Sequence, residues 1–119
     1  APRDWIFTRS RAHTRSLRLR SILSQAGWEN ANLSDAAQAM HMTPRTLMRK
    51  LEADGTSFQD IKDALRRDIA IRHLQKGENS VEVIAYEVGF SSAANFHRAF
   101  QRWTGNTPSF YRQKRTSDN

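Results

Sequence analysis

The sequence predicts an all-α protein with seven helices, grouped as two similar lobes joined by one long helix. Apolar residues recur at helical spacing along most of the chain, and no segment alternates polar and apolar residues for long enough to form a strand. All five glycines also stand where an apolar-periodic segment ends, as expected of residues that terminate helices. The expected helices cover residues 14–26, 33–40, 44–54, 58–76, 81–88, 92–104 and 108–114.

The first expected helix follows a segment that has no clear periodicity, and it stops before Gly27. Residues 1–15 are therefore expected to be an N-terminal extension, a remnant of a linker between domains. Within it, Trp5, Ile6 and Phe7 form a small apolar group. The sequence leaves two alternatives for this group, packing against the body of the protein or hanging free.

The second and third helices begin at recognisable capping residues. Asn32 precedes the second, with Asp35 at its third position, which is a loose form of the capping box. Thr43 supplies a capping hydroxyl to the third helix. Pro44 then suits its first position, because proline lacks an N–H that would be unpaired there in any case.

The fourth helix, residues 58–76, is the longest and is expected to link the lobes. Ser57 and Asp60 form a loose cap at its start. Its apolar residues lie near helical spacing: Phe58, Ile61, Leu65, Ile69, Ala70 and Leu74. At about 1.5 Å per residue, a helix of this size spans roughly 28 Å.

The last three helices surround an aromatic cluster. Gly89 marks a sharp corner between the first two of them, where glycine adopts a positive φ at least cost. Thr107 and Pro108 start the third, and residues 115–119 are expected to be a disordered tail. Six aromatic residues are expected in the core of this region: Phe90, Phe96, Phe100, Trp103, Phe110 and Tyr111.

An internal repeat relates the two lobes. Six apolar positions recur at offsets of 48 or 49: Leu33, Ala36, Ala37, Met40, Leu47 and Leu51 as Val81, Ile84, Ala85, Val88, Phe96 and Phe100. Each repeat is a helix, a corner and a second helix, which is the pattern of a helix-turn-helix. In that motif one helix braces and the next offers its polar face to a DNA major groove. A plain four-helix bundle is the alternative, but it does not require two matched units.

The second repeat and its continuation carry further distinctive positions, namely Ile84-Ala85, Gly89-Phe90, Phe96, Arg98, Phe100, Gly105, Pro108 and Tyr111-Arg112. The chain here resembles the AraC/XylS family of bacterial regulators, in which I-A-x-x-x-G-F, F-x-R-x-F and G-x-x-P-x-x-Y-R recur. The resemblance covers residues 16–114 and implies an AraC-type DNA-binding domain. It places the first helix-turn-helix at about 33–54, the linker helix at 58–76 and the second helix-turn-helix at about 81–104.

The charge balance also fits a nucleic-acid partner. The 119 residues include 19 Lys and Arg against 12 Asp and Glu, a formal net charge of +7. Residues 1–20 hold six arginines and residues 98–119 five basic residues, each with a single acid. Basic proteins bind polyanions, so nucleic acid and an anionic membrane surface are both candidates, and a role in solubility alone is the third reading. No segment approaches the length of a membrane span, and we expect no membrane association.

The first candidate reading helix starts at Pro44. With Leu47 and Leu51 turned inward, four residues remain near its exposed amino end: Arg45, Thr46, Met48 and Arg49. Arginine can bridge the two major-groove acceptors of guanine, threonine can bond a base or a phosphate, and methionine can contact a thymine methyl group. The resemblance implies base contacts at the positions of Arg45, Met48 and Arg49, although methionine departs from the polar residue usual there. Ordinary solvated arginines are the alternative reading.

The second candidate reading helix has Phe96 and Phe100 inward. Its outward residues are the expected base contacts of the second lobe: Ala93, Ala94, Asn95, His97 and Arg98. Asparagine can pair with adenine and arginine with guanine or a phosphate, whereas the alanines offer only shape and methyl contact. We therefore expect this lobe to discriminate bases less than the first. A structural ion pair is the alternative role for Arg98.

Phosphate contacts are expected at helix starts and from nearby basic side chains. Unpaired N–H groups at helix amino ends favour anions. The expected phosphate-contacting residues are Asn32, Ser80, Arg102, Thr107 and Arg112. Such contacts position a protein on DNA but carry no sequence information.

We do not expect an enzyme, because the chain lacks the motifs of common catalytic sites. Its four histidines are scattered, cysteine is absent, and there is no phosphate-binding loop or nucleophile elbow. We expect no cofactor and no metal. A helical adaptor that binds proteins rather than DNA is the alternative function.

The expected function is sequence-specific binding of double-stranded DNA across two successive major grooves, as part of a transcription regulator in the bacterial cytoplasm. The resemblance implies an activator, RNA polymerase as a further partner, and a missing ligand-sensing part. The fragment itself is expected to be monomeric and the complete protein dimeric.

Overall fold

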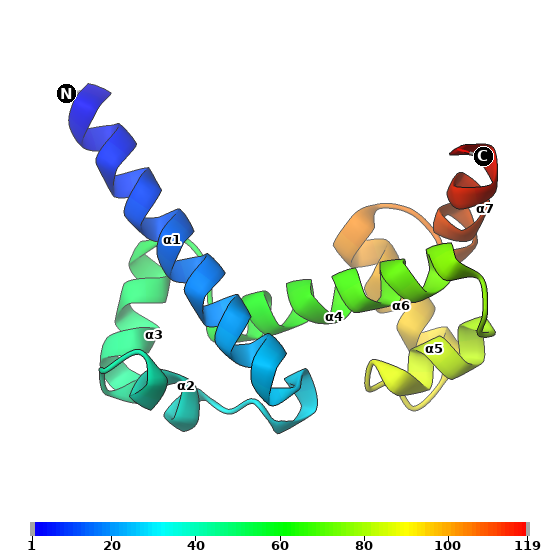
Figure 1. Ribbon diagram of the computed structural model, residues 1–119, viewed down its shortest axis with the longest axis horizontal. Helices are drawn as coiled ribbons and strands as arrows, with labels where there is room; N and C mark the ends of the chain where they lie inside the picture. The colour runs from blue at the N-terminus through cyan, green and yellow to red at the C-terminus, as the bar shows by residue number, and fades with distance from the viewer. Residues whose placement is uncertain (1, 119) are drawn as a thin grey trace. The chain divides into compact units, whose positions relative to one another are not determined.

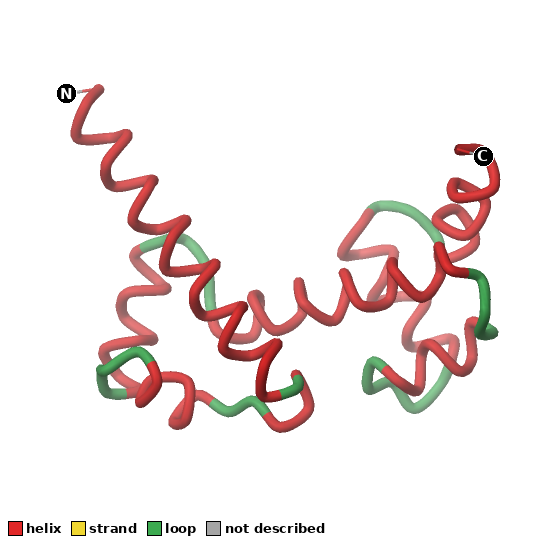
Figure 2. The backbone as a smooth tube through the Cα atoms, in the orientation of Figure 1, coloured by secondary structure: helices red, strands yellow, loops and turns green. Residues whose placement is uncertain are grey.

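The computed structural model describes residues 2–118, and side chains over residues 11–113. Over this range it contains seven α-helices, one 3-10 turn and no strand (Figure 2). The elements are α1 (Pro2–Ala26), η1 (Trp28–Asn30), α2 (Leu33–Ala39), α3 (Pro44–Ala53), α4 (Phe58–Lys76), α5 (Val81–Glu87), α6 (Ala93–Thr104) and α7 (Pro108–Asp118).

The predicted fold class is confirmed, and α2 to α6 agree with the expected helices to within one residue at each end. The expected capping residues also act as such. Asn32, Thr43 and Ser80 each accept a hydrogen bond from the backbone N–H three residues ahead. The short turn η1 was not expected.

Two helices are longer than the sequence analysis suggested. The first was expected to begin at residue 14, but α1 begins at Pro2, because proline suits a first helical position and no later glycine or proline interrupts the segment before Gly27. The last was expected to end near residue 114, but α7 continues to Asp118 through a stretch that also has no glycine or proline. Residues 115–118, which the sequence suggested as part of a disordered tail, belong to α7 in the structure, and Asn119 lies outside the described residues. The side chains of the apolar group at residues 5–7 also lie outside them.

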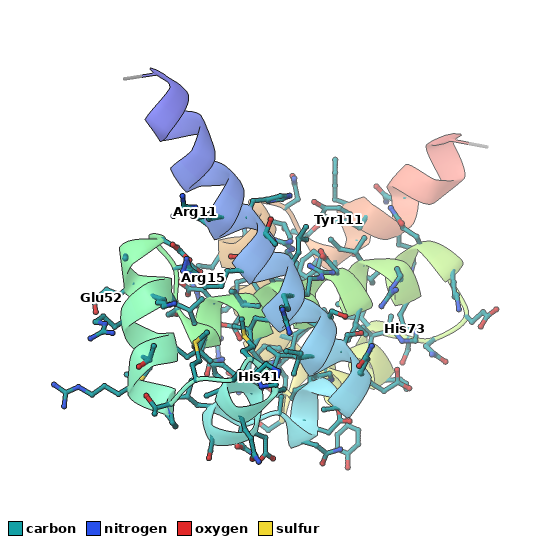
Figure 3. All side chains as sticks on the ribbon, turned by 60° about the vertical axis from the view of Figure 1, so that its left-hand side comes forward. Arg11, Arg15, His41, Glu52, His73 and Tyr111 are labelled. Carbon is teal, nitrogen blue, oxygen red and sulfur yellow. The ribbon has the colours of Figure 1, made fainter. Side chains whose placement is uncertain are left out.

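The chain divides into two compact units, Ala1–Leu65 and Arg66–Asn119, whose boundary falls within α4. In the first unit, α1 contacts α2, and α2 contacts α3 (Figure 1). The fully buried apolar side chains of this unit come from several helices: Leu19, Leu23, Ala37, Leu47 and Leu51. An ion pair between Arg15 Nε and Asp54 Oδ2, 3.2 Å apart, joins α1 to the C-cap of α3. Figure 3 labels Arg15 on α1.

The second unit has its own core, formed by Ala70 and Leu74 of α4 with residues of α5 and α6. Its centre is aromatic. Phe96 packs against Phe100 with ring centroids 5.4 Å apart, and Tyr111 of α7 meets Phe100 edge-on at 5.3 Å. Phe90 lies 5.6 Å from Phe96 and so connects the corner before α6 to this cluster. The expected aromatic core is confirmed for these residues, but Phe110 is 46% exposed and lies at its edge.

None of the helices over the described residues is both long enough and apolar enough to cross a bilayer.

Candidate nucleic-acid interface

The first unit contains a helix, a tight turn and a second helix. Helix α2 ends at Ala39 with Met40 as its C-cap, and His41 then adopts a left-handed conformation with φ 59°. The amide of Met42 reaches back to the carbonyl of Ala37, 3.0 Å away, which closes the turn. The next residue, Thr43, caps α3 by accepting from the amide of Thr46 at 3.1 Å.

The second unit repeats this arrangement. Helix α5 ends at Glu87 with Val88 as its C-cap, and Gly89 then adopts a left-handed conformation with φ 96°. The amide of Phe90 donates to the carbonyl of Ala85 at 2.9 Å, the counterpart of the bond in the first turn. This turn is one residue longer than the first, because Ser91 stands before the cap of α6. The cap, Ser92, accepts a hydrogen bond from the amide of Asn95 at 3.1 Å. Each unit therefore holds a helix-turn-helix whose second helix, α3 or α6, is the candidate reading helix.

Helix α3 has one buried and one exposed face. Leu47 and Leu51 are fully buried, as expected, and they fix the rotation of the helix. On the opposite side Arg45 and Arg49 are exposed, and Met48 is 56% exposed. The α3 reading face, defined as Arg45, Thr46, Met48 and Arg49, thus presents two exposed cations and one exposed apolar side chain.

Thr46 is less available than its three neighbours on this face. Its side chain is partly buried, and its hydroxyl accepts a hydrogen bond from the Thr43 hydroxyl at 2.9 Å. The Thr46 hydroxyl can still donate to an acceptor on DNA.

Helix α6 is held in the same way, by the fully buried Phe96 and Phe100. The α6 reading face is defined as Ala93, Ala94, Asn95, His97 and Arg98. Ala94, Asn95 and Arg98 are exposed, whereas Ala93 and His97 are partly buried. The structure brings two of its polar side chains together, because Arg98 Nη2 donates to Asn95 Oδ1. The Asn95 amide group in turn donates to the Ser91 hydroxyl at 3.3 Å. In the protein alone, Asn95 is therefore already engaged.

The expected phosphate-contacting residues fall into two groups. Asn32, Ser80 and Thr107 each cap a helix by accepting a backbone amide hydrogen bond, at 2.8, 3.2 and 3.2 Å. Arg102 is exposed on α6. Arg112 is different, since its side chain is partly buried and its Nη2 donates to the carbonyl of Asn79.

Two residues near the interface were not singled out from the sequence. His41 stands in the first turn at the position that glycine takes in the second, and the repeat offset of 48 would have revealed this. Arg66 of α4 reaches the second turn, where its Nε donates to the carbonyl of Val88 at 2.9 Å. No sequence pattern marks Arg66, because its role depends on contacts between residues 22 positions apart.

Comparisons with known proteins agree with this geometry. A family profile described as "Helix-turn-helix domain" matches residues 36–114, about two thirds of the chain. The chain is 35% identical over 96 residues to an ornithine utilization regulator of Pseudomonas aeruginosa, a match that covers 81% of this chain and 28% of that protein. It is 33% identical over 98 residues to a urease operon transcriptional activator of Escherichia coli, a match that covers 82% of this chain and 33% of that protein. The chain thus spans about a quarter to a third of the length of these relatives.

Solved structures share the fold. A Chromobacterium violaceum transcriptional regulator with an AraC-type DNA-binding domain matches with a TM-score of 0.76 at 23% identity, covering 89% of this chain and 96% of that one. The transcriptional regulator CdpR of Pseudomonas aeruginosa matches with a TM-score of 0.71 at 29% identity, covering 83% of this chain and 31% of that one.

Proposed function

Because this chain belongs to the AraC family of helix-turn-helix transcription regulators, we propose that it is the DNA-binding portion of a larger bacterial activator and reads duplex DNA with both α3 and α6. The observation that carries the proposal is the repeated turn. Both units close it with the same backbone hydrogen bond, and both leave the polar face of the following helix exposed. A reading helix must present such a face to the major groove. The family is one of regulators, and no catalytic role is proposed.

The α3 reading face supplies most of the base discrimination. Arg45 and Arg49 each carry a fork of donors that fits the O6 and N7 acceptors of guanine. Met48 on the same face contacts a thymine methyl group, since a thioether side chain gives little hydrogen-bonded readout. Thr46, tied to Thr43, bonds a phosphate or a base edge at close range.

The α6 reading face discriminates less. Arg98 reads guanine or bonds a phosphate, and the hydrogen bond from Arg98 to Asn95 supports Asn95 as the residue that orients it. His97 is a further donor or acceptor, while Ala93 and Ala94 contribute only shape and methyl contact. A pairing of Asn95 with adenine requires that it first release Arg98.

Phosphate contacts hold the two reading helices in register on the duplex. The amino ends of α2, α5 and α7, at Asn32, Ser80 and Thr107, supply backbone N–H groups, and Arg102 adds an exposed cation. The formal net charge of +7 supports a large electrostatic share in binding.

The complete regulator is proposed to act in the bacterial cytoplasm, with RNA polymerase as its second partner. The chain spans 28% and 33% of two relatives that are named as regulators of ornithine utilization and of a urease operon. A further part that senses a ligand and dimerises fits that difference in length, and this portion alone acts as a monomer.

The test is selection of bound sequences from a random duplex pool, followed by gel shifts at physiological salt. We expect enrichment of one asymmetric sequence and an affinity for it at least about 1,000-fold above that for a scrambled duplex of equal composition. The matched control is a variant with Arg45→Ala and Arg49→Ala, which should no longer enrich the same sequence. A wild-type chain that enriches nothing and shifts no duplex would favour the helical adaptor instead.

A further inference from the structure

Helix α5 of the second helix-turn-helix is too short to hold itself in place. It has seven residues, Val81–Glu87, whereas isolated helices shorter than about 12–15 residues are marginal in water. Only Ile84 and Ala85 within it are buried. The turn that orients α6 begins at its last residue, so anything that fixes α5 also fixes the α6 reading face.

The carboxyl end of α5 is held by Arg66. The Nε of Arg66 donates to the carbonyl of Val88, 2.9 Å away, and so satisfies an acceptor at the helix end. The same guanidinium lies 4.7 Å from the ring centroid of Phe90 and 5.6 Å from that of Trp103. One cation thus contacts the end of α5, the turn and the last part of α6 together.

The amino end of α5 is held by Arg112. Its Nη2 donates to the carbonyl of Asn79, the residue just before the cap Ser80. The neighbouring Tyr111 packs edge-on against Phe100 of α6, and this contact anchors the start of α7. The two ends of α5 are therefore each bonded by an arginine from another helix of the same unit.

We propose that Arg66 and Arg112 are positioning residues that clamp α5 and so set the pose of the α6 reading face, and that neither contacts DNA. The inference rests on the proposed function, and for Arg112 it replaces the phosphate contact that the sequence alone suggested. Both side chains are partly buried, and both donate to backbone carbonyls inside the unit. A contact with a DNA phosphate would instead require the guanidinium group to be exposed to solvent.

The two roles predict different losses on DNA. A phosphate contact strengthens binding to every sequence, so its removal weakens a selected and an unrelated duplex alike. A positioning residue strengthens only the docked, specific complex. Its removal should lower affinity for the selected duplex and leave affinity for the unrelated one unchanged.

The test compares Arg66→Met with Arg67→Met, a matched control that removes the same charge one residue further along α4. The Nε of Arg67 donates to the carboxylate of the adjacent Asp68, 3.0 Å away, on the same helix. On the duplex selected by the wild-type chain, Arg66→Met should bind about 10- to 100-fold more weakly, with less than about a twofold change on a scrambled duplex. Arg67→Met should change the affinity for the selected duplex and for the scrambled duplex by the same small factor. Equal losses of Arg66→Met on both duplexes, or no loss on either, overturn the proposal.

A second pair of variants covers the case in which circular dichroism shows that Arg66→Met has lost helix. Arg66→Lys keeps the charge but lacks the planar fork and the Nε donor, and Arg67→Lys is its control. The lysine variant at 66 should still lose about tenfold on the selected duplex only. Wild-type affinity for that duplex would refute the clamp. Arg112→Lys should likewise lose about tenfold in affinity on the selected duplex only. Wild-type affinity of this variant for the selected duplex would also refute the clamp.

A measurement without DNA separates this inference from the proposed function. Amide hydrogen exchange of Val88 and Phe90, whose N–H groups bond within the end of α5 and its turn, should become about tenfold faster in Arg66→Lys. The amides of Met40 and Met42 in the first unit serve as internal controls and should not change. Unchanged exchange at Val88 and Phe90 refutes the clamp. Failure of the wild-type chain to select any duplex would refute the proposed function alone.

Discussion

His41 and Gly89 occupy the same place in the two turns, yet only one of them is a glycine. Both are left-handed, with φ of 59° and 96°, and in each case the next residue donates its amide to the helix before, at 3.0 and 2.9 Å. A left-handed conformation costs a non-glycine residue roughly 1–2 kcal/mol. The first turn therefore carries backbone strain that the second does not.

Substitution of His41 by glycine should accordingly stabilise the first unit. We expect a net gain of about 0.5–1 kcal/mol, because glycine also loses more conformational entropy on folding. The opposite kind of change, Gly89→Ala, should destabilise the second unit by about 0.5–1 kcal/mol, because the same entropy difference offsets part of the strain. Urea denaturation followed by circular dichroism checks both. A lower midpoint for His41→Gly would mean that the imidazole makes contacts that outweigh the strain.

Removal of the guanidinium groups from the reading faces should weaken specific binding. Arg45→Ala, Arg49→Ala and Arg98→Ala are each expected to cost about 1–3 kcal/mol on the selected duplex, with an unchanged helical spectrum because all three side chains are exposed. Arg102→Ala, a backbone contact in our proposal, should weaken all sequences alike. Wild-type affinity in the first three variants would show that α3 and α6 do not face the DNA with these residues.

Truncation of the aromatic core should unfold the second unit rather than alter its specificity. Phe96 is fully buried between Phe90 and Phe100, and Phe96→Ala should cost about 3–5 kcal/mol. Trp103→Ala should also destabilise this unit, to a lesser extent because its side chain is only partly buried. Thermal melting measures both. A stable Phe96→Ala protein that has lost only DNA binding would argue that α6 is rotated in solution.

Binding should depend steeply on salt. If about 5–7 phosphates are neutralised, the logarithm of the association constant should fall with the logarithm of salt concentration at a slope of roughly −4 to −6. Fluorescence anisotropy of a labelled duplex over a salt series gives this slope. An affinity that is the same at low and physiological salt would contradict the role given to the basic surface.

The spacing of the two DNA segments should matter as much as their sequence. Successive major grooves on one face of DNA recur about every 10 base pairs, and α4 is one continuous helix over its 19 residues. We expect a monomer to protect two segments at this spacing. An insertion of half a helical turn, about five base pairs, between them should abolish protection of one segment. Equal affinity for both duplexes in footprinting would show that the two helix-turn-helix motifs act independently.

The sequence predicted the parts of the fold that depend on local signals. Helix α4 has the predicted bounds because Ser57 caps it and Gly77 ends it, and the rotation of α3 follows from the spacing of Leu47 and Leu51. The start of α1 was not predicted, because residues 2–13 lack the apolar periodicity on which the prediction relied.

The sequence could not predict which polar side chains bond one another. Arg112 and Arg102 are both arginines near the carboxyl end, yet one is bonded to the carbonyl of Asn79 and the other is exposed. Arg66 reaches a carbonyl 22 residues away, and Arg98 is bonded to Asn95. The bonds of Arg66 and Arg112 depend on how helices pack, and the bond of Arg98 depends on its side-chain conformation. Composition and spacing could therefore suggest the α6 reading face but not the engagement of its residues.

Two separate cores in one chain have a consequence for how such a regulator diverges. The buried side chains of α3 and those of α6 belong to different units, so a substitution on one reading face leaves the packing behind the other untouched. Free-energy changes at distant sites that share no partners are close to additive. A descendant of this protein can therefore acquire a new recognition sequence in one half of its target while it retains the old one in the other half, and no intermediate has to lose both.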